Sequence, residues 1–316
     1  MIRPLGPTDV VALSGLHQQA ALFEVTAHTW PRVQPESDYL SYLALLTHVL
    51  SRPIDHRGTW VHEERGAIVG IVFGQSRARG LVWDVERLYA KQDRDACALL
   101  DHFCSQAVVA GARRVFMETP SGVRGAEIGR RTSFERYSSA QLYHLPAGAP
   151  RADGPVLEAR ARARHDSQGL FQLYLAAVPR RTRSAEATTL EEWLALARKR
   201  ERWPRVLSRR RQELVWSGPG GVNAWAEAVV GRGSQYLELL VHPDREADLD
   251  AILCYALQRT SPRRPVYARA RDFQPALASA LERAGFRPVC DVDIYVKQLA
   301  ARARLPALLP AQVVRA

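Results

Sequence analysis

The stretch Leu239–Leu253, LLVHPDREADLDAIL, has the outline of a strand that leads through a turn into a helix. Backbone N–H groups at such a helix start can bind a phosphate, and glycines let the chain approach it closely. Four acidic residues stand here instead: Asp244, Glu246, Asp248 and Asp250. Carboxylates at a helix N-terminus stabilise the helix by about 0.3–1 kcal/mol and compete with a phosphate for the same field. The pattern therefore predicts a helix start that has lost a phosphate site.

The elements around this stretch are repeated within the chain. A strand, a helix, a strand, a helix and a closing strand follow one another from Leu239 onward, and the same order begins at Asp84. An offset of 151 residues aligns Leu88 with Leu239, Arg94 with Arg245 and Phe116 with Tyr267, and an offset of 152 aligns Phe134 with Phe286 and Tyr143 with Tyr295.

The segments before these strands also correspond. Thr8-Asp9 and Asp166-Ser167 each have the composition of a helix N-cap before an apolar helical pattern. The remaining expected elements are helices at Tyr39–Leu50 and Leu190–Ala197, and hairpins of Thr59–His62 with Ala67–Gly74 and of Glu213–Ser217 with Val222–Val230.

The stretch AGAPRADGP, residues 147–155, is rich in Gly, Pro and Ala and predicts the domain boundary. We expect two tandem domains, residues 1–148 and 149–316. Each is an α/β (α+β) unit in which helices flank a mostly antiparallel mixed sheet.

This order of elements resembles the GNAT (N-acetyltransferase) superfamily. In that superfamily a strand ending in V-x-P leads into the acyl-CoA pyrophosphate loop, and a helix ending in G-F precedes the last strands. Val241-His-Pro243 and Gly285-Phe286 match these motifs in the C-terminal half, and the N-terminal half matches through the repeat. The resemblance covers nearly the whole chain and implies two tandem GNAT-like domains.

The resemblance implies acetyl-CoA or another acyl-CoA as co-substrate. Its loop pattern, R/Q-x-x-G-x-G/A, falls on Arg245, Asp248 and Asp250 in one half and on Arg94, Cys97 and Leu99 in the other, so the arginines are kept and the small residues are lost. The positions that would hold the donor are Leu88, Tyr89, Ala90 and Arg94 in the N-terminal half and Leu240, Val241 and Arg245 in the C-terminal half.

Transfer to an amine needs a base, and often an acid for the departing thiolate. The family resemblance makes carboxylates of the fourth strand the candidate bases, here Asp84 and Glu86, which alternation places on one face, and Glu238. A strand carboxylate is more often simply a residue on the solvated face of the sheet. In many family members a tyrosine four residues before the G of G-F supplies this acid. Here Leu281 occupies that position in the C-terminal half, and by the repeat Gly129 occupies it in the N-terminal half. We interpret Tyr143 and Tyr295 as core or rim aromatic residues.

Two further patterns have structural explanations. Arg124–Gly129, RGAEIG, resembles a pyrophosphate loop, but the repeat makes it the start of the last helix of its half. Cys97, His102 and Cys104 could suggest a metal site, yet the two cysteines are seven residues apart on a helix of Ala, Leu and Phe, which favours buried thiols. We expect no metal.

The 316 residues carry a net charge of +11, and almost all of the excess lies after residue 150, above all in the arginine-rich run 198–211. Such a run can be a solvated surface, as we favour, or can contact a polyphosphate or CoA, with nucleic acid as the least favoured partner. No apolar run is long enough to span a bilayer, no leader precedes the first helix, and no CxxC pair occurs, which predicts a cytoplasmic protein, monomer or homodimer, without a membrane partner.

Two functions remain open. One is an acyl-CoA-dependent N-acyltransferase that acts on a small-molecule amine. The other is a catalytically inactive GNAT-fold binding or scaffold protein with an anionic ligand. The missing glycines and tyrosines favour the second function and the family resemblance favours the first, and the identity of the acceptor does not follow from the sequence.

Overall fold

The structure, a computed structural model, describes residues 1–9, 13, 57–77, 80–151, 157–197, 210–218, 220–230 and 233–299. The predicted helix at Tyr39–Leu50 and nearly all of the arginine-rich run 198–211 lie outside these residues. Within them, no helix combines the length and the apolar character needed to cross a membrane.

The described strands follow the same order in the two halves, and from β4 and β10 onward the alternation of helices and strands is also the same. The N-terminal half (residues 1–148) contains β1 (Ile2–Pro4), β2 (Arg57–Glu64), β3 (Ala67–Arg77), β4 (Val82–Ala90), α3 (Asp93–Val109), β5 (Arg114–Pro120), α4 (Val123–Arg131) and β6 (Glu135–Leu145). The C-terminal half (residues 149–316) contains β7 (Arg160–Ala161), α5 (Ser167–Ala177), α6 (Arg180–Glu186), α7 (Leu190–Ala197), β8 (Arg210–Gly218), β9 (Gly221–Val230), β10 (Gln235–Val241), α8 (Leu249–Gln258), β11 (Val266–Arg271), α9 (Pro275–Arg283) and β12 (Arg287–Gln298). The predicted hairpins and the helix at Leu190–Ala197 are confirmed.

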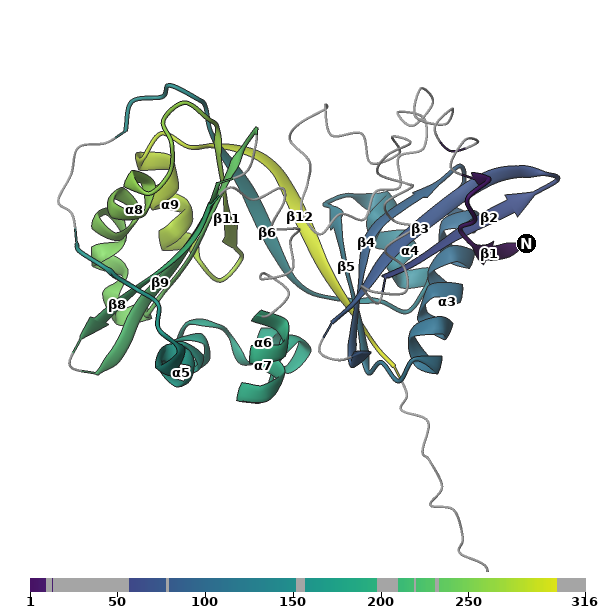
Figure 1. Cartoon of the computed structure of the whole chain (residues 1–316), viewed down its shortest axis with the longest axis horizontal. Coiled ribbons are helices and arrows are strands. Elements are labelled where there is room, and N and C mark those ends of the chain that lie inside the picture. Colours follow the sequence, from purple (N-terminus) through teal and green to yellow (C-terminus); the bar gives the residue numbers. More distant parts are fainter. Residues whose placement is uncertain are drawn as a thin grey trace, which may run out of the picture.

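All twelve strands belong to one sheet, in the order β1-β2-β3-β4-β5-β12-β6-β11-β10-β9-β8-β7. The closing strand of each half pairs with the other half, because β12 lies against β5 and β6 lies against β11. The two exchanged strands also pair with each other at the centre, where Figure 1 shows them running between the halves. The order is therefore symmetric about the contact of β12 with β6. Only β4–β5 and β10–β11 are parallel among the described pairs.

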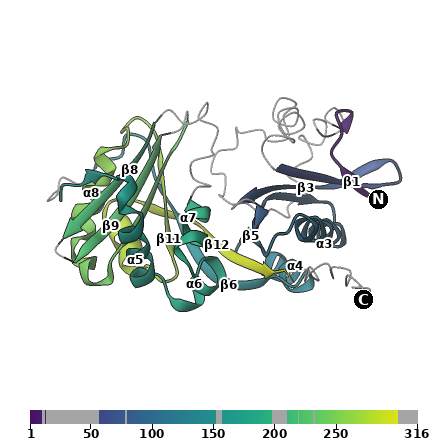
Figure 2. The same ribbon diagram turned by 60° about the horizontal axis from the view of Figure 1, so that its bottom comes forward.

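In the N-terminal half, α3 packs closely against the sheet, below β3 in the view of Figure 2. Gly74 of β3 permits this approach, since a Cβ atom there would lie 1.9 Å from the ring of Phe103. Phe103 is fully buried and its ring meets those of Trp60 and Trp83 edge-on. The apolar face of α3 can therefore pack on β3 only because position 74 has no side chain.

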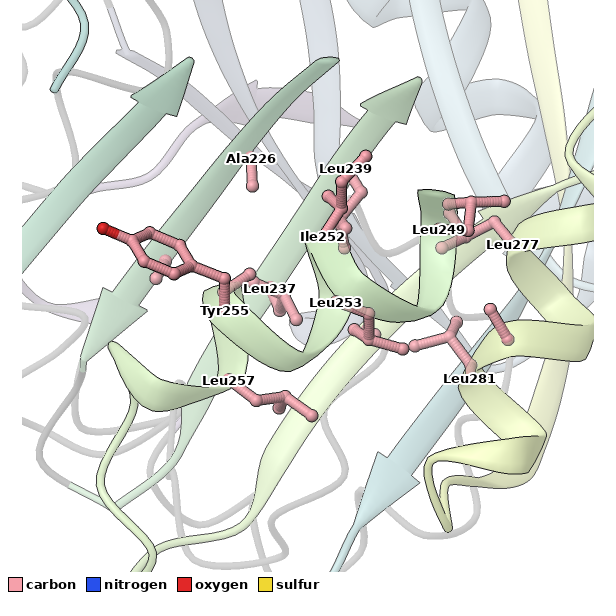
Figure 3. Close-up of a cluster of buried hydrophobic side chains, with 14 of the residues drawn as sticks. Ala226, Leu237, Leu239, Leu249, Ile252, Leu253, Tyr255, Leu257, Leu277 and Leu281 are labelled. Carbon is pink, nitrogen blue, oxygen red and sulfur yellow. The ribbon is translucent and has the colours of Figure 1, made fainter. Parts of the chain in front are cut away.

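In the C-terminal half, α8 and α9 cover one face of the sheet. Figure 3 shows Ile252 and Leu253 of α8 turned toward Leu237 and Leu239 of β10, with side chains of α9 beside them. The opposite face is covered by α5, whose Leu170 and Leu173 pack on the second face of the hairpin β8–β9. Helices therefore cover both faces of this part of the sheet.

The halves begin with a matched ion pair. Arg3 binds Asp9 at 2.6 Å, and Arg160 binds Asp166 at 2.6 Å, six residues apart in both cases. Each aspartate also accepts a backbone N–H from three residues upstream, at 2.7 Å. Asp166 is the N-cap residue of α5, as predicted, but its side chain makes no hydrogen bond to the start of that helix. It binds Arg160 of the edge strand and the backbone N–H of Ala163 instead, and a 3-10 turn at Arg164–Asp166 precedes the helix.

The two penultimate helices end alike as well. Ser133 and Gly285, which follow the C-caps of α4 and α9, have φ angles of 58° and 88°. This left-handed conformation is the usual way to end a helix and favours glycine over serine. The repeat therefore conserves a backbone geometry that only one half builds with the preferred residue.

Candidate functional site

Both parallel strand pairs separate after three residues. β4 and β5 are paired at Val82–Asp84 only, although β4 continues to Ala90. β10 and β11 are paired at Gln235–Leu237 only, although β10 continues to Val241. The facing backbone groups beyond these points have no parallel neighbour strand to bind, which creates a place where an extended ligand with amide groups can hydrogen-bond. One such separation lies in each half.

The two separations differ in one respect. β4 contains a bulge, because Phe73 of β3 pairs with Arg87 while Gly74 pairs with Val85, so that Glu86 is an extra residue. β10 pairs with β9 without interruption from Gln235 to Val241. A bulge bends its strand and leaves backbone groups unpaired, and bulges are enriched next to active sites. Only the N-terminal half has this feature at the separation.

The repeat itself confirms that Glu86 is an insertion. Asp84 pairs with Phe116 as Tyr236 pairs with Tyr267, an offset of 152 residues on the fourth strand. Beyond the bulge, Leu88 corresponds to Leu239 with an offset of 151. One residue is therefore gained in β4 between these positions.

The structure separates the two N-terminal candidate bases. Asp84 is buried and its carboxylate forms an ion pair with Arg77. Glu86 is half-buried at the bulge, which breaks the alternation that was expected to place it on the same face as Asp84. Burial lowers the pKa of the neighbouring Arg87 to about 10, and Tyr89 first and Glu86 second oppose that shift. Of the two, Glu86 is the more accessible.

The C-terminal candidate base lies in a row of carboxylates. Glu238 of β10 is opposite Glu227 of β9, which in turn is opposite Glu213 of β8. Arg211 forms ion pairs with both Glu213 and Glu227, and Arg162 binds Glu213 at 2.5 Å. Two arginines thus neutralise the carboxylates of Glu213 and Glu227. These two carboxylates therefore have a structural role, as partners in cross-strand ion pairs of the sheet.

The first turn of α3 carries two carboxylates of its own. The side chain of Asp93 binds Arg124 at 2.7 Å. Asp95 is buried and lies 3.5 Å from His62 and 3.7 Å from the exposed Arg94, which also contacts Glu64 at 3.3 Å. Leu88 and Ala90 are buried at the end of β4, and Tyr89 is half-buried.

The corresponding segment of the C-terminal half has a different backbone. Its helix was expected directly after Pro243, but a 3-10 helix occupies Pro243–Asp248 and α8 begins only at Leu249. Arg245 binds Asp248 at 2.6 Å inside that segment. Of the four acids, Asp250 alone lies in the first turn of α8, where it binds Arg283 at 2.8 Å. Leu240 and Val241, which precede the segment, are half-buried.

A buried charged network joins the halves, and it was not predicted from the sequence. Arg269 binds Glu118 at 3.1 Å, and Arg271 binds Glu186 at 2.5 Å. Tyr137 donates a hydrogen bond to Glu186 at 3.0 Å, and burial raises the pKa of Tyr137 well above its usual value. Each pair joins residues far apart in the chain, so no local spacing could have revealed it.

The other predicted positions agree with structural roles. Tyr143 and Tyr295 are buried, each in the core of the opposite half, because they belong to the exchanged strands. Cys97 and Cys104 are buried free thiols, and burial raises the pKa of Cys104 to about 12. Arg124–Gly129 lies within α4, as predicted. No group of metal-ligating side chains occurs among the described residues.

Comparison with solved structures supports the architecture. The chain is similar to a GCN5-related N-acetyltransferase from Sphaerobacter thermophilus, with a TM-score of 0.56 and 13% identity over 94% of this chain and 95% of that one. A tandem GNAT protein from the clavulanic acid biosynthesis pathway matches with a TM-score of 0.55 and 14% identity, over 94% and 98% of the two chains. A putative acetyltransferase from Pyrococcus horikoshii matches with a TM-score of 0.53 and 12% identity, over 95% and 90%.

No protein-family model and no curated protein matches the sequence. The likeness is therefore one of fold. It extends over 94% of this chain and agrees with the tandem fold expected from the resemblance. The chain has the tandem GNAT fold.

Proposed function

We propose that the protein is an acyl-CoA-dependent N-acyltransferase whose donor site lies in the N-terminal half. The observation that carries this assignment is the bulge at Glu86, next to the point where β4 and β5 separate, together with its absence from β10. A separated strand pair offers backbone groups to the amides of an acyl-CoA arm, and the bulge supplies unpaired groups near the acyl carbonyl.

In this proposal the backbone of Leu88–Ala90 binds the arm, and Arg94 contacts a phosphate at the start of α3. Among the residues that the structure describes, the exposed guanidinium of Arg94 contacts Glu64 at 3.3 Å and Asp95 at 3.7 Å, both long distances, so it can turn toward a ligand. Arg245 is held by Asp248 at 2.6 Å within a 3-10 segment. This difference favours the N-terminal half.

Glu86 is the proposed general base. The amine nitrogen attacks the thioester carbonyl, a C–N bond forms, the C–S bond breaks, and CoA leaves as the thiolate, which takes a proton from solvent to become the thiol. Glu86 removes the proton of the attacking amine, directly or through a water molecule. Replacing Glu86 by Gln should lower kcat by about 100-fold while leaving donor affinity nearly unchanged, and rates measured by release of the CoA thiol would reveal the difference.

One observation favours the alternative of a catalytically inactive binding protein. Asp84, the other carboxylate at the separation, is buried and committed to Arg77. If Glu86 is not catalytic, no carboxylate among the described residues of β4 is left for the role. The protein would then bind an anion without transferring an acyl group, and it would show donor binding without thiol release.

The first experiment is the thermal midpoint with and without acetyl-CoA. A ligand that binds only the folded state stabilises it by about 2.7 kcal/mol at 100 times its Kd. We expect an upward shift that is reduced in Arg94→Ala, because a lost charge-assisted hydrogen bond costs about 1.5–3 kcal/mol. Arg263→Ala removes the same charge from an exposed position outside the site and is the matched control.

Arg245→Ala decides between the halves. A shift that survives Arg94→Ala and disappears in Arg245→Ala would move the donor site to the C-terminal half. An unchanged midpoint of the natural protein at millimolar acetyl-CoA would reject the acyltransferase proposal and direct the search toward another anion.

A further inference from the structure

We infer that Gln274 closes the C-terminal separation with its own side chain, and that Gly122 leaves the N-terminal separation open. This inference rests on the proposed function, because it names the residue that decides which half can take an acyl-CoA arm. It starts from two hydrogen bonds of a single carboxamide.

The carboxamide of Gln274 bridges the two strands after they separate. Its Nε2 donates to the carbonyl oxygen of Leu239 on β10 at 3.1 Å, and its Oε1 accepts from the backbone N–H of Arg271 on β11 at 3.1 Å. The amide thus makes one bond to each strand, as a third strand between them would. The facing groups of Leu239 and Arg271 are satisfied without a ligand.

The backbone around Gln274 fixes this position. Its own N–H donates to the carbonyl of Arg271 at 2.7 Å, in a tight turn at the end of β11. Gln274 is also the N-cap residue of α9, and its carbonyl accepts from Ala278 at 3.1 Å. Strand, turn and helix therefore hold the side chain over the separation.

The equivalent residue of the N-terminal half is Gly122, the N-cap of α4. Because glycine has no side chain, this position cannot bridge β4 and β5. A Cβ atom at Gly122 would have no heavy atom within 4 Å, and its φ of 164° is an extended conformation open to any residue. The N-terminal half therefore has room for the bridge but lacks the group that makes it.

The occupant that Gln274 replaces is defined by its hydrogen bonds. Such an occupant accepts a hydrogen bond from the backbone N–H of β11 and donates one to the backbone carbonyl of β10, through a secondary or primary amide in an extended chain. The pantetheine arm of acyl-CoA has amides of this kind, so the same carboxamide bonds exclude it from the C-terminal half. The four carboxylates of the Asp244–Asp250 segment add a second barrier for the nucleotide phosphates, and none for pantetheine itself.

The test transfers the bridge between the halves. We expect isothermal titration of the full chain with pantetheine to show one site in the natural protein. Gly122→Gln should weaken binding of pantetheine and of acetyl-CoA at least tenfold, because the new carboxamide can occupy the separation. Gly220→Gln, the same substitution in an exposed turn with open space around it, is the matched control.

The reverse change should open the second half. Gln274→Gly copies the residue of the N-terminal half, and Gln274→Ser keeps a good N-cap but is too short to bridge. We expect two pantetheine sites in either variant that folds, as judged by circular dichroism. One site in Gln274→Gly and Gln274→Ser, or natural affinity in Gly122→Gln, would overturn the inference.

The outcomes distinguish the inference from the proposed function. A natural protein that binds neither acetyl-CoA nor pantetheine rejects the proposed function, and the inference then depends on whether Gln274→Gly gains a pantetheine site. A natural protein with one site, combined with variants that do not change it, keeps the proposed function and rejects the inference.

Discussion

Glu118 and Arg269 occupy equivalent positions 151 residues apart, one on β5 and one on β11, and their side chains meet at 3.1 Å. The two strands are separated in the sheet by the exchanged strands β12 and β6. The repeat has thus placed opposite charges at matching positions, where the symmetric strand order brings them together. A duplicated position has become a contact between the halves.

Replacing one residue of this pair should destabilise the protein more than replacing both. Glu118→Leu leaves the Arg269 guanidinium, 84% buried, without its carboxylate, and we expect a loss of about 3 kcal/mol in the free energy of unfolding. The double variant Glu118→Leu, Arg269→Met should recover much of that loss. Urea unfolding of the single and double variants measures the difference, and additive losses would contradict a direct pairing.

Acid should weaken the edges of the sheet. The hydrogen bond from Arg160 holds the pKa of Asp166 at about 2, below its usual value of 3.8. Since the folded-state pKa is depressed, the stabilisation is complete above about pH 4 and is lost as the pH falls toward 2. Asp166→Asn should remove that part of the pH dependence and cost about 1.5–3 kcal/mol at neutral pH.

The matched pair of Asp9 and Arg3 provides a control for this experiment. The hydrogen bond from Arg3 also lowers the pKa of Asp9, so Asp9→Asn should flatten the acid limb in the same direction. Unfolding free energies measured between pH 2 and 6 for both variants test the expectation. An acid limb that is unchanged in a variant carrying both Asp9→Asn and Asp166→Asn would show that other groups cause it.

Substitutions at Ser133 and Gly285, the equivalent positions after α4 and α9, should change the stability in opposite directions. Ser133→Gly relieves a side chain in the left-handed region and should stabilise the protein by roughly 1 kcal/mol. Gly285→Ala introduces that cost and should destabilise it by a similar amount. Thermal midpoints of the two variants should therefore move in opposite directions, and a shift of the same sign in both would contradict the assigned backbone geometry.

The contact between β3 and α3 depends on the absence of a side chain at Gly74. In Gly74→Ala the new Cβ would lie 1.9 Å from the ring of Phe103, so the helix or the ring must move, at a cost of about 1–3 kcal/mol or more. Gly111→Ala has open space but a φ of 86°, and serves to separate backbone strain from overlap. A second change, Phe103→Leu, should rescue Gly74→Ala in equilibrium unfolding and leave Gly111→Ala unimproved.

Much of the fold follows from local sequence. The hairpins β2–β3 and β8–β9, the helix at Leu190–Ala197 and the matching order of elements in the two halves could be predicted, because apolar periodicity and turn residues are local properties. The position of Arg124–Gly129 in a helix followed from the repeat. The N-cap position of Asp166 was predicted correctly, but its side chain binds Arg160 and the backbone of Ala163 and does not cap α5. The predicted start of α8 was wrong, because a 3-10 segment comes before that helix.

The candidate site divides in the same way. The sequence by itself determined which carboxylates and arginines lie near the ends of β4 and β10, and that the glycines of a phosphate loop are absent. Only the tertiary structure decided that Asp84 is committed to Arg77, that Glu86 lies in a bulge, and that Gln274 bridges β10 and β11. Strand pairing and strand exchange depend on contacts between residues far apart in the chain, and local pattern carries no information about which distant partner each strand and side chain will meet.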